Sequence, residues 1–542
     1  MTNIINESSY SGYMFKDPKT NWTSTTQLKA KLTFVEFDNK SINTAGGIPV
    51  ISDGKKAFVD TSDNHCVIYG ASGFKKSICV FMPLIGSLSS AGESMVILDP
   101  KGELYARTAA LLKSRGYKII VLNFRDFNGD GYNPLHYPAK LWRNVGETDK
   151  AASVANVFGC ALAQRQENHR NVDPIWPDTA KAYINGVLPM MFDSYKNIDD
   201  INLLALADYF TERSADYLKE FVNESKINNT AITNIKTVLS EPEKTRMSTL
   251  STCSSFIQPF IQNDKLARML SHSTFELEDI AQEKTALYII TDDTTTACNP
   301  IVGVLISQLQ TILVDKAFHS ENGKLNNRVN FILDEFCSFP IPGIGEALAT
   351  HRSRNIKYYL CIQSIDALSD RYPHYESLLA NCATVLFLGS TEMKLLEMIS
   401  TRCGETEINY SGAKEPLISI PELMTLRKSW DSKEALYLNL AESVRYCTNL
   451  PAIEQYESFT RFGKSDLPNI THPKVNVYTF NELLRDISID EAKYPFSEPS
   501  KITNKKKKKR KETQENVFLS ENIQKELDIK FEELFGVTSE ED

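Results

Sequence analysis

The sequence predicts a mixed α/β fold with a largely parallel sheet, interrupted by an all-α region and followed by a charged tail. Short, continuously apolar runs rich in β-branched and aromatic residues recur along the chain, separated mostly by helical stretches. Such runs are typical of strands buried on both faces of a parallel sheet. No run of this kind occurs between about 141 and 280, and seven consecutive basic residues stand at 505–511. A block of like charge is expected to be disordered.

The predicted elements follow in chain order. Weak strand alternation appears around "KLTFVEF", within an N-terminal segment of residues 1–60. The predicted strands are 65–70, 94–103, 117–124, 285–291, 329–336, 357–364, 384–390 and 435–440. The predicted helices of the interruption are 147–166, 176–195, 201–224 and 228–272, the last broken near Pro242. After the basic block, Ile523, Leu527, Phe531 and Leu534 recur at helical spacing, which indicates a short amphipathic docking helix.

Composition bounds the class of protein. A chain of 542 residues is too long for one ordinary core and suggests two to four domains. With 42% hydrophobic and 24% charged residues, it has the composition of a soluble globular protein. The net charge of −9 excludes a basic nucleic-acid coat, so any nucleic-acid contact must come from local patches.

Cysteine usage and hydropathy predict the compartment. The ten cysteines are scattered and form no C-x-x-C pair, which argues against a zinc site or a disulfide framework and for the reducing cytoplasm. No apolar run approaches the roughly 18 residues of a membrane-spanning helix. The first residues, "MTNIINESSY", lack the apolar region of a signal peptide. We therefore expect a chain that neither spans a membrane nor is secreted by the general route.

The stretch "YGASGFKKS", residues 69–77, has the spacing of a phosphate-binding loop with one departure. Gly70, Lys76 and Ser77 match G-x-x-x-x-G-K-[S/T], but Lys75 occupies the place of the second glycine, where a side chain could crowd the site. An apolar strand precedes the loop and an apolar helix follows it, as phosphate binding requires. The predicted nucleotide ligands are Gly70, Ala71, Ser72, Gly73, Phe74, Lys75, Lys76 and Ser77. The alternative is a plain strand–turn–helix connection.

Lys76 is predicted to reach the β- and γ-phosphates and Ser77 to hold Mg²⁺. Asp334 and Glu335 end the apolar run "VNFIL", where a carboxylate is costly unless it is paired or binds a cation. Beside a phosphate loop, Asp334 would orient the Mg²⁺ shell and Glu335 would act as a general base. The alternative is a salt-bridged strand end.

Two further residues fit a nucleotide site. Gln363 ends the next predicted strand and could sense the γ-phosphate or position water; a capped strand end explains it equally well. Arg352, with its neighbour Arg354, lies between these two strands. In ring ATPases such an arginine reaches the phosphate of the neighbouring subunit, whereas the alternative is a solvated basic loop.

Three segments of the sequence resemble a known family. The segments "LDPKGELYARTAALLKSRGYKIIVLNF", "LDEFCSFPIPGIGEALATHRSRNIKYYLCIQSIDAL" and "LLANCATVLFLGS" are similar to the coupling-protein ATPases of conjugation and type IV secretion, the TraG/TraD-like relatives of DNA translocases. The resemblance runs from about Asn64 to Gly404, with a weaker echo at 21–28. It maps the family's phosphate-loop lysine and hydroxyl onto Lys76 and Ser77 and its acidic pair onto Asp334 and Glu335. Its trans-acting arginine falls on Arg352, and its glutamine on Gln363.

The resemblance implies a RecA-like ATPase, binding ATP and Mg²⁺, that assembles as a ring, expected to be a homo-hexamer. It divides the chain into the N-terminal segment 1–60, a nucleotide-binding domain in two parts (61–140 and 281–500), an all-α domain (141–280) and the charged tail (501–542). The implied partners are a relaxase or relaxosome, single-stranded DNA and the subunits of a type IV secretion channel. The membrane helices usual at the family's N-terminus are missing here, which leaves a shortened chain or a member recruited by a small membrane-anchoring protein.

Two rival functions stay open. A nucleotide-binding receptor with little hydrolysis is favoured by Lys75. A double-stranded DNA pump of chromosome partitioning is disfavoured by the helical insertion, which such pumps lack there.

The basic block predicts an electrostatic tether to DNA or to an anionic membrane, or alternatively a plain spacer. We expect the protein to be cytoplasmic and peripheral at the inner face of the plasma membrane.

Overall fold

The structure is a computed structural model, and it describes residues 22–37, 43–144, 146–167, 175–224, 230–292, 294–408 and 413–489. The described residues up to 486 belong to one compact unit. The predicted tail at 501–542, with its basic block and amphipathic helix, lies outside the described residues, and so does the start of the N-terminal segment.

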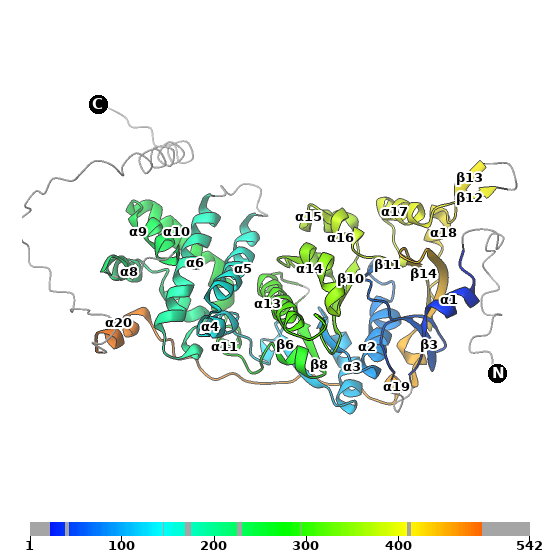
Figure 1. Ribbon diagram of the computed structural model, residues 1–542, viewed down its shortest axis with the longest axis horizontal. Helices are drawn as coiled ribbons and strands as arrows, with labels where there is room; N and C mark the ends of the chain where they lie inside the picture. The colour runs from blue at the N-terminus through cyan, green and yellow to red at the C-terminus, as the bar shows by residue number, and fades with distance from the viewer. Residues whose placement is uncertain are drawn as a thin grey trace, which may run out of the picture. The chain divides into compact units, whose positions relative to one another are not determined.

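A sheet of ten strands organises the chain, in the order β15-β14-β11-β4-β10-β9-β5-β8-β6-β7 (Figure 1). Its strands are β4 (Cys66–Gly70), β5 (Ser94–Leu98), β6 (Lys118–Asn123), β7 (Asn128–Gly129), β8 (Thr285–Ile290), β9 (Val329–Leu333), β10 (Ile356–Ile362), β11 (Thr384–Gly389), β14 (Ser432–Asn439) and β15 (Val444–Pro451). The seven strands from β11 to β6 are parallel to one another. The edge strands β7, β14 and β15 pair antiparallel. The predicted mixed α/β fold with a mostly parallel sheet is confirmed, and each of the eight predicted runs contains one strand.

Both faces of the sheet are covered along its central strands, which explains why those strands are almost entirely apolar. In β4, Cys66 and Ile68 join one core cluster together with Leu84 of the helix α2 (Met82–Ser90) and Leu111 of the helix α3 (Glu103–Ser114). The intervening residues of β4 are equally buried but point to the opposite face. Every position of β4, β5, β8, β9, β10 and β11 is buried, so the period-2 alternation of a half-buried sheet is absent from these strands.

Helices and short turns connect the later strands. They are α13 (Asn299–Phe318), η4 (Phe336–Ser338), α14 (Ile344–Thr350), η5 (His351–Arg354), α15 (Ile365–Arg371), α16 (Tyr375–Ala380), α17 (Met393–Cys403) and α18 (Ile420–Met424). Among the described residues, α13 has the length and apolar composition of a membrane span, and 72% of its apolar window is buried inside the protein. Polar residues such as Gln308 and Gln310 interrupt its apolar sequence, and its burial shows that α13 packs as a core helix.

Between β7 and β8 the described secondary structure is all helical. The helices are α4 (His136–Trp142), α5 (Thr148–Glu167), α6 (Ile175–Ser194), η3 (Ile198–Asp200), α7 (Leu203–Asp208), α8 (Glu212–Glu224), α9 (Thr230–Ser240), α10 (Glu243–Ile261), α11 (Asp264–Met269) and α12 (Asp279–Gln282). In Figure 1 the helices from α4 to α11 form a bundle of their own, whereas α12 contacts the sheet strands β5 and β8. The predicted break at Pro242 falls between α9 and α10. The single helices predicted at 201–224 and after Pro242 are wrong in detail. Thr211 accepts the Ser214 N–H and Asn263 accepts the N–H groups of Lys265 and Leu266, so these residues cap new helices and begin α8 and α11.

The N-terminal segment holds more strand than its weak alternation indicated. After the helix α1 (Thr25–Lys31), an antiparallel sheet forms in the order β1 (Thr33–Glu36), β3 (Lys56–Asp60), β2 (Ile48–Ser52). Asp60 attaches it to the large sheet, because the hydroxyls of Thr384 and Tyr437 both donate to its Oδ2 at 3.0 Å. A second small hairpin, β12 (Glu405–Ile408) and β13 (Ala413–Pro416), follows α17.

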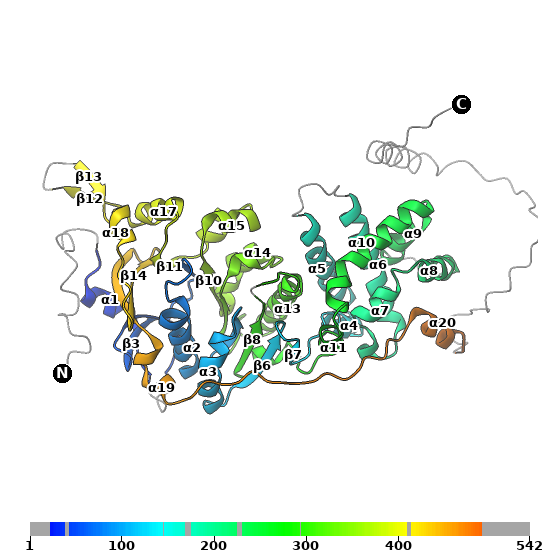
Figure 2. The same cartoon turned by 180° about the vertical axis from the view of Figure 1, so that it is seen from behind.

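The chain after β15 leaves the sheet and returns to the helical bundle. It passes through η6 (Ile453–Gln455) and α19 (Glu457–Thr460), runs extended, and ends in α20 (Phe480–Ile489) (Figure 2). Near its start, the Ser465 N–H donates to the Ala106 carbonyl of α3 at 2.8 Å. At its end, the Phe480 ring packs on Tyr209 at 4.8 Å. One extended segment therefore links the large sheet with the helices inserted into it.

Candidate functional site

The loops that follow β4, β5, β9 and β10 meet at one edge of the sheet. In the register of these parallel strands, Tyr69 lies beside Ile362, and Leu333 lies between Leu98 and Leu360. A cleft of about 270 Å³ opens there. Its lining residues are Ser72, Gly73, Phe74, Lys75, Lys76, Ser77, Ile78, Asp99, Pro100, Lys101, Glu103, Asp334, Glu335 and Gln363. The structure thus brings together most of the residues that the sequence singled out.

The loop from Gly70 to Lys76 connects β4 to a helix that opens with a π-helical turn, η2 (Ser77–Phe81), and continues as α2. A Cβ at Gly70 would lie 3.2 Å from the Lys76 side chain, so the close packing of the loop depends on glycine there. Gly73 has φ +80°, a conformation that favours glycine. The Ala71 N–H donates to the Gly389 carbonyl at 3.2 Å, which ties the loop to the end of β11.

Lys75 occupies the glycine position in the conformation that a glycine would adopt. Its φ is +60°, which costs a non-glycine residue about 1–2 kcal/mol. Its ammonium donates to the carbonyls of Ser429 and Trp430 at 2.5 and 2.8 Å. The charged end of the side chain is therefore held by the segment that precedes β14, although Lys75 also lines the cleft. Because the ammonium is bonded to that segment, this geometry does not require the crowding that the sequence suggested.

Lys76 is buried, with 9% of its surface exposed, and its ammonium donates to the carbonyls of Gly70 and Ala71 at 2.9 and 3.1 Å. These partners hold the charge within the cleft, over the start of the helix. A buried ammonium beside backbone N–H groups of a helix start is an arrangement suited to an anion.

The acidic pair lies opposite Lys76, at the end of β9. Burial raises the pKa of Asp334, although the Lys76 charge opposes that rise. Asp334 accepts the backbone N–H of Glu335 at 3.0 Å, and Glu335 has φ +54°. From the neighbouring strand, the Gln363 amide donates to the Glu335 carboxylate at 3.4 Å. A left-handed backbone at a non-glycine residue is typical of functional sites, and here it sets Glu335 within reach of Gln363.

Asp99 also lines this cleft, and the sequence reasoning did not include it among the site residues. Its side chain is 2% exposed and accepts the Tyr105 backbone N–H at 2.8 Å. Burial raises its pKa to about 7, and the nearby charge of Asp334 adds to the rise. The sequence signal was available: Asp99 ends an apolar run, as Asp334 does.

Arg352 lies apart from the cleft. It precedes β10, and its guanidinium donates to Asn64, which precedes β4, at 3.3 Å. Since β4 and β10 are parallel, both residues lie at the amino edge of the sheet, opposite to Lys76. Arg352 is largely exposed there. It cannot act on the cleft of its own chain.

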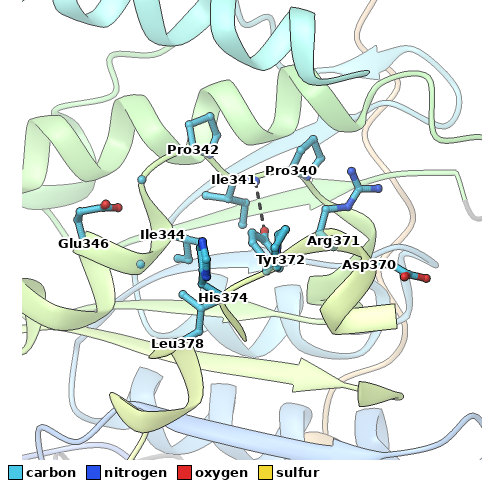
Figure 3. Close-up of a pocket in the computed structure, with 13 residues that line it drawn as sticks. Pro340, Ile341, Pro342, Ile344, Glu346, Asp370, Arg371, Tyr372, His374 and Leu378 are labelled. Carbon is cyan, nitrogen blue, oxygen red and sulfur yellow. Dashed lines mark hydrogen bonds between the residues drawn. The ribbon is translucent and has the colours of Figure 1, made fainter. Parts of the chain in front are cut away.

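A second hollow of about 430 Å³ is formed by the chain that follows η4 (Figure 3). The loop from Pro340 to Gly345 and the stretch after α15 form its walls. The Tyr372 hydroxyl donates to the Phe339 carbonyl at 2.7 Å and accepts the Ile341 N–H at 3.3 Å, the bond drawn in Figure 3. None of the residues predicted from the sequence as ligands lines this hollow.

The sheet and its cleft define an α/β protein with a charged ligand site at the carboxyl ends of parallel strands. The chain belongs to the family described as type IV secretory system conjugative DNA transfer, which matches residues 21–425. It is 27% identical over 372 residues to a conjugal transfer protein TraG of Escherichia coli, covering 64% of this chain and 55% of that protein. A second Escherichia coli TraG is 25% identical over 378 residues, covering 66% and 58%. The chain thus spans little more than half the length of these curated relatives.

Solved structures show the same fold. The bacterial conjugative coupling protein TrwBdeltaN70, in complex with sulphate, aligns with a TM-score of 0.60 at 16% identity, covering 83% of this chain and 96% of that one. TrwB in complex with the ATP analogue ADPNP aligns with a TM-score of 0.60 at 15% identity, over 83% and 96% of the two chains. TrwB with ADP and Mg²⁺ aligns with a TM-score of 0.58 at 16% identity, over 84% and 95%. At these identities the likeness establishes the fold.

Proposed function

We propose that this chain is the ATPase of a coupling protein: a RecA-like domain with an all-α insertion that delivers a relaxase-bound single strand, or a protein substrate, to a type IV secretion channel. The observation that carries the proposal is the convergence of Lys76, Asp334, Glu335 and Gln363 on one cleft behind a glycine-containing loop. Membership of the conjugative DNA transfer family supplies the context.

The residues present fit a nucleotide with Mg²⁺. The loop from Gly70 to Ser77 would surround the phosphates through its backbone N–H groups. Lys76 would exchange its bonds to the loop carbonyls for phosphate oxygens, since its ammonium already lies in the cleft. Ser77 and Asp334 supply the oxygen donors that Mg²⁺ prefers. When bound, Mg²⁺ neutralises charge on the phosphates.

Glu335 would accept a proton from the attacking water, and Gln363, which donates to its carboxylate at 3.4 Å, would orient it. Charge on the γ-phosphate still needs a second cation. Arg352 would supply it in trans, because its position at the opposite edge of the sheet excludes its own cleft. This proposal requires a ring, expected to be a hexamer, in which the amino edge of one subunit faces the cleft of the next.

The geometry of Lys75 also bears on the choice between an ATPase and a nucleotide receptor with little hydrolysis. The sequence favoured the receptor because a lysine in the glycine position could crowd the nucleotide. The Lys75 ammonium is bound to the carbonyls of Ser429 and Trp430, so this argument for the receptor is weakened. The partners remain proposals: a relaxase, single-stranded DNA held mainly through its phosphates, channel subunits and a small membrane-anchoring protein. A location at the cytoplasmic face of the plasma membrane also remains a proposal.

Phosphate release from ATP, with and without single-stranded DNA, tests the proposal. Lys76→Ala should lower turnover about a hundredfold or more, because one charge-stabilising donor is typically worth that much. The exposed helix residue Lys113 provides the control: Lys113→Ala should turn over at the wild-type rate. Wild-type turnover by Lys76→Ala would place the active site elsewhere. Nucleotide binding by the wild type without turnover would establish the receptor instead.

Mixing two inactive variants tests the arginine. Arg352→Ala protein has an intact cleft, and Lys76→Ala protein has an intact arginine. A mixed ring contains interfaces that combine the two intact halves, so some turnover should return on mixing. If mixed rings form, as shown by pull-down of differently tagged subunits, and no turnover returns, Arg352 does not act in trans.

A further inference from the structure

Two lysines, Lys75 and Lys428, bond the phosphate loop to the segment from Leu426 to Ser432, here called the clamp segment. Lys75 donates to the carbonyls of Ser429 and Trp430, as described above. In the reverse direction, the Lys428 ammonium donates to the Gly73 carbonyl at 2.6 Å. From β14, the buried Lys433 ammonium donates to the carbonyls of Leu426 and Arg427 at 3.0 and 3.3 Å. The clamp segment and the phosphate loop thus form one bonded unit.

Phe74 of the phosphate loop makes two further contacts, with Lys433 of β14 and with Gly389 of β11. The Lys433 ammonium lies 5.5 Å from the centre of the Phe74 ring. The ring packs so closely on Gly389 that a Cβ there would lie 2.4 Å from it. Within the clamp segment, Ser429 donates to the Asp431 carboxylate at 2.6 Å, which fixes the turn around Trp430.

Trp430 is the exposed residue of this rigid turn. Its side chain is 81% exposed, the highest value among the large apolar side chains that the structure describes as exposed. An indole exposed beside the loop leaves a large apolar surface in water, and tryptophan is enriched where such a ring meets a binding partner. Its backbone carbonyl is 2.8 Å from the Lys75 ammonium, so the residue adjoins the loop, although it does not line the cleft described above.

The strand order fixes which part of a nucleotide would face Trp430. β4 lies between β10 and β11, and β9 lies beyond β10. Glu335 and Gln363 follow β9 and β10, so the reacting end of a triphosphate must point to that side. The clamp segment leads into β14, which lies beyond β11 on the other side. A nucleotide that spans the loop therefore places its nucleoside at the clamp segment.

We propose that Trp430 is the platform on which the base of the bound nucleoside triphosphate stacks, and that Lys75 and Lys428 are positioning residues that hold this platform on the phosphate loop. The inference rests on the proposed nucleotide site and adds its base-binding half. It also gives Lys75 a role: the lysine replaces a glycine because its ammonium anchors the platform. Stacking accepts any base with an aromatic face, so discrimination between purines should be weak.

Calorimetric titration with ATP and with inorganic triphosphate, which lacks a base, tests this. Trp430→Ala should weaken ATP binding about tenfold, in the range of one base–aromatic stack. It should leave triphosphate binding unchanged, and Trp430→Phe should recover most of the ATP affinity because it restores a ring. Phe318→Ala removes another exposed aromatic side chain, 72% exposed on α13, and should bind both ligands like the wild type.

The outcomes separate this inference from the proposed function. If the wild type binds both ligands and Trp430→Ala binds ATP as tightly as the wild type, the platform is refuted and the nucleotide site stands. An equal loss for ATP and triphosphate also refutes it, because the tryptophan would then support the loop and not the base. A wild type that binds neither ligand would overturn the nucleotide site and the platform together.

Discussion

Replacing Asp99 by asparagine should stabilise the protein increasingly as the pH rises. Burial raises the pKa of Asp99 from 3.8 to about 7. The native carboxyl therefore holds its proton up to about pH 7, while the unfolded one releases it near 3.8. Stability falls as the pH rises through this window, because the unfolded state then binds fewer protons than the native state. Asparagine keeps an oxygen for the Tyr105 N–H and carries no charge.

The size of the effect follows from the shift in pKa. A shift from 3.8 to about 7 corresponds to about 4 kcal/mol of unfolding free energy at alkaline pH. At pH 5 about 1.6 kcal/mol of this cost is already present, because the unfolded carboxyl has largely ionised. The stability difference between Asp99→Asn and the wild type should therefore grow by about 2–3 kcal/mol from pH 5 to pH 8.

Urea unfolding of both proteins at pH 5 and pH 8, with EDTA and without nucleotide, measures this difference. Asp292→Asn is the control. The backbone N–H and the hydroxyl of Thr294 donate to the Asp292 carboxylate and lower its pKa, so Asp292 titrates below this window. Asp292→Asn should change stability by the same amount at both pH values. A difference for Asp99→Asn that stays equal between pH 5 and pH 8 would refute the reasoning, since Asp99 would then be as well solvated as an exposed carboxyl.

Three further predictions concern the loop and the extended segment. Lys75→Gly should keep kcat within about twofold while KM for ATP rises, as steady-state kinetics would show; a kcat loss of about tenfold would mean that Lys75 acts on the reacting phosphate. Gly389→Ala places a Cβ 2.4 Å from the Phe74 ring and should lower stability by about 1–3 kcal/mol and weaken ATP binding, measured by thermal shift with and without ATP. Phe480→Ala removes the ring on Tyr209 and should speed proteolysis at residues 463–489 with ATP turnover unchanged; equal proteolysis would show that this contact does not hold the segment.

The sequence by itself determined the features that depend on neighbouring residues. Strands buried on both faces must be apolar along their whole length, so the eight runs marked the sheet. A phosphate loop needs its lysine and hydroxyl at fixed spacing, so residues 70–77 could be predicted to form one in spite of Lys75. The break near Pro242 was predictable because proline lacks the N–H that a helix interior requires. Family membership rested on the order of these local segments.

Only the tertiary structure decided what depends on residues far apart in the chain. The order of the strands set Arg352 at the opposite edge from Lys76, although Arg352 is close in sequence to the acidic pair. The role of Lys75 depends on carbonyls more than 350 residues away, at Ser429 and Trp430. Asp99 joined the cleft because β5 lies beside β9, a pairing that no local pattern encodes. A sequence shows which side chains carry charge, whereas the fold brings them together and sets which charges are buried, and burial and neighbouring charges decide their pKa values.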